Sequence, residues 1–100
     1  MKTKDESVNI WGLEKVMQPV LYNADVIWKE YGKELVITSA RDGIHSAGSL
    51  HYYGLAVDLR THYFSEADKY SVAQDLRDEV GNDFDVIVHK SHIHVEYDPR

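Results

Sequence analysis

The chain has 100 residues, of which 43% are hydrophobic, and its formal net charge is −6. This length suits one domain with a single core, and the apolar fraction is too high for a disordered chain. An acidic protein with no run of Lys or Arg is a poor partner for nucleic acid or an anionic membrane. The chain has no cysteine, which excludes disulfides and leaves His, Asp and Glu as the strong metal ligands.

The N-terminal segment of the chain carries little apolar sequence. Residues 1–8 are polar, and we expect them to be frayed. No signal peptide follows them, and no apolar run is long enough to cross a membrane. We therefore expect a monomer with one domain over residues 1–100, made in the cytoplasm.

The first predicted element is a helix. Apolar residues recur at helical spacing over residues 13–31, which predicts one apolar face. Pro19 lies inside this pattern, so it should kink the helix or open a second segment near Gln18. Gly32 suits the C-terminus of the helix. Both tryptophans, Trp11 and Trp28, are expected to pack in the core.

Two strands and a second helix follow. The β-branched, apolar stretch 34–40 predicts a strand, and the alternating stretch 55–60 predicts another. Between them, residues 41–49 are typical of a loop. Ser65 can cap a second helix, which Gly81 and the asparagine after it should end.

The last segment predicts a hairpin. Residues 85–89 and 92–97 both alternate, with Lys90 and Ser91 between them, although Lys-Ser is not a favoured turn. A two-residue turn would pair His89 with His92, Ile87 with His94, and Asp85 with Glu96. The elements together predict an α+β fold, a small and mostly antiparallel sheet with helices packed on one face.

Two short motifs carry the chemistry. His51 precedes Asp58 by seven residues, and His92 and His94 lie in the last strand. Imidazole and carboxylate ligands suit zinc, and three protein ligands leave a fourth position open, as in catalytic zinc sites. Taken singly, these residues are typical of the solvated face of a sheet, so only their combination indicates a metal site.

The residues that carry a resemblance are Ile37-Thr38-Ser39-Ala40-Arg41, Ser49-x-His51-x-x-Gly54-x-Ala56-x-Asp58 and His92-x-His94. From about residue 34 to 97, this pattern resembles the zinc D-Ala-D-Ala carboxypeptidase family. That family shares a superfamily with lysostaphin-type endopeptidases and the hedgehog signalling domain.

The resemblance implies a role for each matching residue. His51, Asp58 and His94 match the zinc ligands, and His92 matches a residue that assists catalysis. Arg41 matches an arginine that holds the substrate, and we count Ser49 with it as substrate-binding. The match departs from the family at Ser91, where several branches have a glutamate base. His92 is therefore the first candidate base.

Other residues of the hairpin face could support or replace His92. His89 lies next to it in the expected register and is the second choice as base. Asp85 and Glu96 could orient a histidine through its other ring nitrogen, or serve as an alternative base.

The sequence thus predicts a zinc peptidase that hydrolyses a peptidoglycan stem or cross-link peptide, of carboxypeptidase or endopeptidase type. By resemblance, the bond would involve D-amino acids. A phage endolysin that degrades the cell wall after release fits the expected absence of a signal peptide. The alternative is a zinc-containing module of the same fold that binds a peptide or protein without cutting it.

Overall fold

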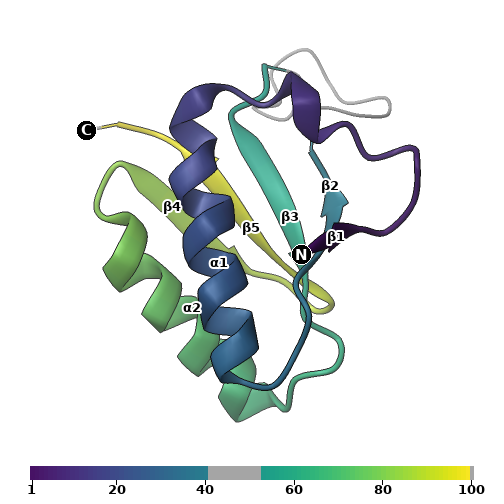
Figure 1. Cartoon of the computed structure of the whole chain (residues 1–100). Helices are drawn as coiled ribbons and strands as arrows, with labels where there is room; N and C mark the ends of the chain where they lie inside the picture. The colour runs from purple at the N-terminus through teal and green to yellow at the C-terminus, as the bar shows by residue number, and fades with distance from the viewer. Residues whose placement is uncertain (41–52, 100) are drawn as a thin grey trace.

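The computed structural model describes residues 1–40 and 53–99 and confirms the α+β fold class. Figure 1 shows two helices against one face of a twisted sheet. The elements, in chain order, are β1 (Lys2–Thr3), η1 (Ile10–Gly12), η2 (Lys15–Met17), α1 (Gln18–Glu30), β2 (Val36–Ser39), β3 (Ala56–Arg60), α2 (Glu66–Val80), β4 (Phe84–Val88) and β5 (His92–Tyr97). In the described part of the chain, no helix is long and apolar enough to cross a bilayer.

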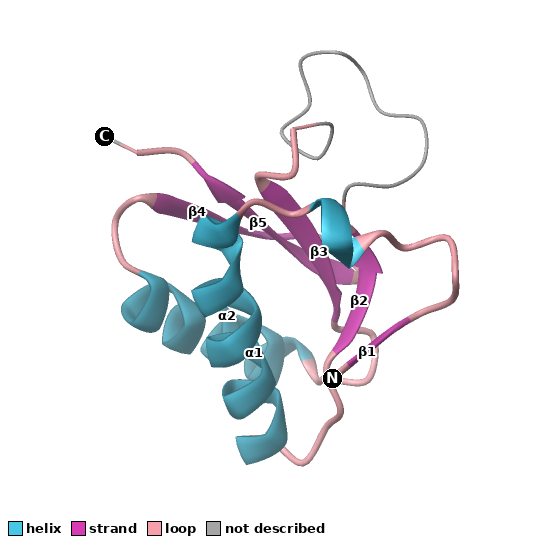
Figure 2. Cartoon of the chain, turned by 45° about the horizontal axis from the view of Figure 1, so that its top comes forward, coloured by secondary structure: helices cyan, strands magenta, loops and turns pink. Residues whose placement is uncertain are grey.

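The described strands form one sheet in the order β1-β2-β3-β5-β4. Every neighbouring pair is antiparallel except β1 with β2. Both helices cover the same face, as the turned view in Figure 2 also shows. The inward side chains of the central strands are fully buried against those helices, among them Val57, Leu59, Ile93 and Val95. Because side chains alternate along a strand, Asp58 and His94 point to the opposite, helix-free face.

The proline in the first helical pattern opens α1 and does not kink it. The helix begins at Gln18 with Pro19 in its first turn, where the missing N–H costs no hydrogen bond. Two 3-10 turns occupy the segment before it. The helix ends at Glu30 with Tyr31 as its C-cap, and Gly32 takes a φ of 74°, a conformation that favours glycine.

The two tryptophans behave differently. Trp28 is fully buried, and its Nε1 donates a hydrogen bond to the Arg60 carbonyl at 3.1 Å. The expectation of core packing is wrong for Trp11, which is 94% exposed. Trp11 lies in the 3-10 turn η1, before α1 begins, so the helical periodicity that buries Trp28 does not extend to it.

The second helix begins as predicted. Ser65 is its N-cap, and the Ser65 hydroxyl accepts a hydrogen bond from the backbone N–H of Asp68 at 3.1 Å. Gly81 ends the helix with a φ of 85°. The buried stripe of α2 contains a charged residue, Lys69, beside Val72, Ala73 and Leu76.

The hairpin register is confirmed. Ile87 pairs with His94 and Asp85 with Glu96, and the His89 N–H donates to the His92 carbonyl at 2.9 Å. The helix-facing side of the hairpin is apolar, and the opposite side carries the polar and histidine side chains together with Ile87.

The expectation of a frayed N-terminus is wrong for its first residues. Lys2–Thr3 forms β1, which adds a parallel strand to the edge of the sheet beside β2. The Lys2 N–H donates to the Leu35 carbonyl and the Lys4 N–H to the Ile37 carbonyl, each at 2.9 Å. A backbone ladder needs no apolar side chains, which is why polarity alone misled the expectation.

Candidate metal centre

The candidate site is built where β3 and β5 lie side by side. Asp58 and His94 are direct partners in this antiparallel pair, so both side chains rise from the helix-free face at the same place. The His94 Nδ1 atom lies 2.8 Å from the Asp58 Oδ1 atom. Two residues 36 positions apart in the chain thus bring a nitrogen and an oxygen ligand atom together.

A second carboxylate approaches the same ring from the other side. The His94 Nε2 atom lies 2.8 Å from the Glu96 Oε1 atom. Hydrogen bonding to Asp58 raises the pKa of His94, burial opposes it, and hydrogen bonding to Glu96 adds to the rise. We expected Asp85 or Glu96 to orient a histidine through its other ring nitrogen, and Glu96 contacts His94 Nε2 and holds the ring in a fixed orientation.

Two further histidines border the site. The His92 Nε2 atom lies 3.8 Å from the Asp58 Oδ1 atom. The His89 ring stacks on the His92 ring, with centroids 4.6 Å apart and planes 24° apart. The same His89 ring meets His94 edge-on at a centroid distance of 6.4 Å. Both candidate bases therefore lie beside the paired Asp58 and His94.

The remaining predicted site residues lie outside the described residues: Arg41, Ser49 and His51. The glycine of the same motif is described, and its role is structural. Gly54 has a φ of 74°, and a Cβ there would collide with the Gly12 carbonyl oxygen. The Gly54 carbonyl in turn accepts a hydrogen bond from the Glu14 N–H at 2.9 Å. Only glycine allows this close approach, which fixes the entry into β3.

The donor set can be tested against zinc. In a tetrahedral site with bonds of about 2.0–2.1 Å, two ligand atoms lie about 3.3 Å apart. The His94 Nδ1 and Asp58 Oδ1 atoms lie 2.8 Å apart, so a small outward movement would let both bind one ion. The Glu96 carboxylate on Nε2 reproduces the carboxylate–histidine arrangement common behind zinc. The described residues therefore fit two ligands of a zinc site, and the third expected ligand, His51, lies outside the described residues.

An acidic trio adjoins this centre. One oxygen from each of Asp85, Glu96 and Asp98 lies within 4.8 Å of the others. The alternation of the two hairpin strands placed Asp85 and Glu96 on one face, but Asp98 lies just beyond β5 and the pattern did not include it. Carboxylate trios of this kind are common on protein surfaces, so the trio does not define a site of its own.

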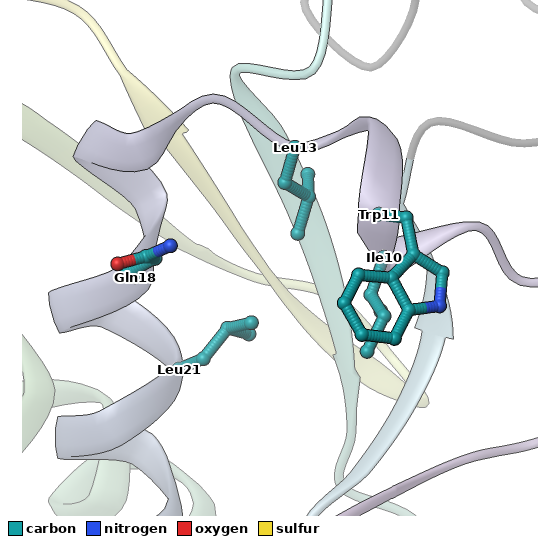
Figure 3. A pocket seen from close by; sticks show the side chains of 5 residues that line it. All are labelled: Ile10, Trp11, Leu13, Gln18 and Leu21. Carbon is teal, nitrogen blue, oxygen red and sulfur yellow. The ribbon is translucent and has the colours of Figure 1, made fainter.

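A hollow away from the helix-free face of the sheet was not predicted from the sequence. It measures about 210 Å³ and is lined by Ile10, Trp11, Leu13, Gln18 and Leu21. Figure 3 shows the Trp11 ring on one side of this hollow and the side chains of α1 on the other. The exposed aromatic side chain, Trp11, belongs to η1, a 3-10 turn that the helical pattern of the sequence did not predict.

Comparison with known proteins gives the family. The sequence matches the family model of the hedgehog amino-terminal signalling domain over residues 15–96. The chain belongs to this family. The match spans α1 through most of β5 and so includes Asp58, His92, His94 and Glu96. No curated protein matches the chain.

The family places this hedgehog-type domain among proteins whose fold is related to that of zinc peptidases. This agrees with the superfamily inferred from the motifs. The narrower resemblance, to the D-Ala-D-Ala carboxypeptidases, is not part of that match.

Proposed function

We propose that this hedgehog-type domain is a zinc peptidase acting on a peptidoglycan stem or cross-link peptide. The observation that carries the proposal is the Asp58–His94 pair, backed by Glu96 on the second ring nitrogen. The two carboxylates together fix the orientation of the His94 ring. A histidine that presents Nδ1 to a metal needs both a carboxylate neighbour and a fixed ring.

The proposed roles follow from position. Asp58 and His94, with His51, would hold zinc, which when bound would activate water and polarise the peptide carbonyl. Glu96 keeps the His94 ring turned so that Nδ1 faces Asp58. Three ligands leave room for substrate on the helix-free face of the sheet.

His92 is the proposed proton-transfer residue. Its Nε2 lies 3.8 Å from Asp58, at the edge of the candidate centre, and could take a proton from water and pass it to the leaving amine. His89 stacks on it and is the second choice. Arg41 and Ser49 are proposed to bind the substrate, the arginine through a planar fork that matches a carboxylate.

The experiment incubates the zinc-loaded protein with purified peptidoglycan fragments and follows the products by mass spectrometry. We expect new peptide termini that disappear with excess chelator and return with added zinc. Hydrolysis that continues in excess chelator would exclude the metal mechanism. Product masses would also identify the bond and separate carboxypeptidase from endopeptidase cleavage.

A second function has two observations in its favour. The matched family is described as a signalling domain, and Ser91 occupies a position where related peptidases have a glutamate base. A hedgehog-type domain that holds zinc and binds a peptide or protein would need no base. Zinc binding without any hydrolysis of wall fragments would favour this binding module.

A further inference from the structure

Three hydrogen bonds to backbone carbonyls hold the end of the sheet at the Lys90-Ser91 turn. The Trp28 indole donates to the carbonyl of Arg60, which is the partner of His92 across β3 and β5. The next N–H along the chain, that of Thr61 just after β3, donates to the Ser91 carbonyl at 3.0 Å. The third bond comes from Lys69, whose Nζ lies 3.2 Å from the Lys90 carbonyl oxygen.

Lys69 is the unusual member of this set. Its side chain is only 6% exposed, and lysine is almost never buried without partners. One partner is Glu66, at 2.9 Å, but the Glu66 side chain is 79% exposed. An ion pair with so exposed a carboxylate contributes little to stability. The Lys90 carbonyl is thus the contact that accounts for a buried amine at this place.

The Lys90-Ser91 turn, which Lys69 contacts, lacks the residue types that stabilise a two-residue turn locally. Lys90 and Ser91 lack the Gly, Asn or Asp that stabilise two-residue hairpin turns. Among the described residues, only glycines have a positive φ, so this turn does not use the favoured left-handed geometry. Its conformation therefore depends on tertiary hydrogen bonds, and Lys69 supplies one from helix α2.

We propose that Lys69 is a positioning residue that fixes the Lys90-Ser91 turn and, through it, the stacked His89 and His92 rings beside Asp58. The two rings lie on either side of this turn, with centroids 4.6 Å apart. A turn free to move would change the 3.8 Å separation of His92 from Asp58. The inference rests on the proposed function for its catalytic meaning but not for its structural content.

The experiment replaces Lys69 with methionine, which keeps the buried aliphatic stem and removes the donor. We expect kcat on wall fragments to fall by up to about 10²-fold, as for a misplaced catalytic group, with KM and zinc content unchanged. In histidine ring NMR spectra of the zinc-loaded chain, the His89 and His92 resonances should move. Those of His62, an exposed residue next to Tyr63, should not.

Glu66→Gln is the matched control. It removes the exposed partner of Lys69 and leaves the Lys90 contact, so turnover and ring resonances should stay as in the wild type. A folded Lys69→Met chain with unchanged His89 and His92 resonances would overturn the proposal. So would a Glu66→Gln chain with the same losses, because the exposed ion pair would then be the operative contact.

Folding is checked by thermal unfolding of each variant. If Lys69→Met does not fold, Lys69→Gln restores an amide donor at the same position. Failure of that variant to fold as well would make Lys69 a core residue and overturn the positioning role. If the wild type hydrolyses nothing, the peptidase proposal fails, while the ring resonances still decide whether Lys69 positions the histidines.

Discussion

His94 lies between two carboxylates, with its Nδ1 2.8 Å from Asp58 on β3 and its Nε2 2.8 Å from Glu96 on its own strand. This arrangement uses both ring nitrogens, so the ring cannot turn without losing a hydrogen bond. The two carboxylates have different proposed roles. Asp58 is the proposed fellow ligand of His94, whereas Glu96 is proposed to orient the ring through Nε2.

The first prediction concerns the ligands. Asp58→Ala and His94→Ala should each lose zinc, because two remaining protein ligands hold the ion poorly. Elemental analysis of the purified variants measures the loss. His62→Ala is the control, since this exposed histidine lies outside the site and should leave the stoichiometry unchanged. Wild-type zinc content in both ligand variants would remove the basis for the site.

The second prediction concerns orientation by Glu96. Glu96→Gln keeps the size of the side chain and weakens its bond to His94 Nε2. Loss of such an outer partner typically lowers metal affinity by roughly 10–100-fold, and we expect a change in that range. Competition with a zinc chelator measures it. Glu79→Gln, on the exposed side of α2, is the matched control and should keep wild-type affinity. An unchanged affinity in Glu96→Gln would mean that the ring is fixed by other contacts.

The third prediction concerns the base. His92→Ala should keep zinc and lose turnover by roughly 10²–10⁴-fold, the usual contribution of general acid–base catalysis. The loss should appear in kcat more than in KM if His92 acts only in the transition state. Loss of zinc as well would make His92 a ligand or a support for one. Near-normal turnover, with a defect instead in His89→Ala, would move the base to the neighbouring ring.

The fourth prediction concerns the fold without metal. Chelation should leave the far-UV circular dichroism spectrum largely unchanged, because the buried faces of both helices and of the sheet form a core apart from the site. A structural zinc would instead unfold the chain on removal. Collapse of the spectrum in chelator would therefore assign the metal a structural role.

The fifth prediction concerns pH in the chelated protein. The pKa of His94 is raised above its ordinary value of 6.5, first by the Asp58 hydrogen bond and against the effect of burial. Its proton therefore binds more tightly in the folded chain, and the resulting stability is fully present below pH 6.5. That stability is lost as pH rises through the raised, folded-state pKa.

Urea unfolding of the chelated protein across this window tests the sign. The wild type should lose stability with rising pH, and His94→Asn should lack that part of the slope. His62→Asn should retain it. A His94→Asn slope equal to that of the wild type would assign the pH dependence to another group.

Much of the scaffold follows from local sequence. Ser65 caps α2 because its hydroxyl accepts a hydrogen bond from a free helical N–H. Pro19 lies in the first turn of α1 because proline has no N–H, and an N–H at that position would have no partner within the helix. The hairpin register follows from strict alternation on both sides of Lys90-Ser91. The resemblance named Asp58 and His94 as two of three expected ligands, and the structure pairs them across β3 and β5.

Other features depend on packing between distant segments. The burial of Lys69 and the exposure of Trp11 contradict what their residue types suggest, because the first reaches a hairpin turn and the second precedes the helix. β1 formed because a free sheet edge offered backbone partners to a polar segment.

The sequence by itself determined which residues could bind a metal, since ligand chemistry belongs to the side chains. It also determined that Asp58 and His94 share one face of their strands, since alternation is a local property. Only the tertiary structure decided that β5 lies between β3 and β4, so that Asp58 faces His94 directly. Strand order is set by how the whole sheet buries its apolar face against α1 and α2, and no local pattern encodes that choice.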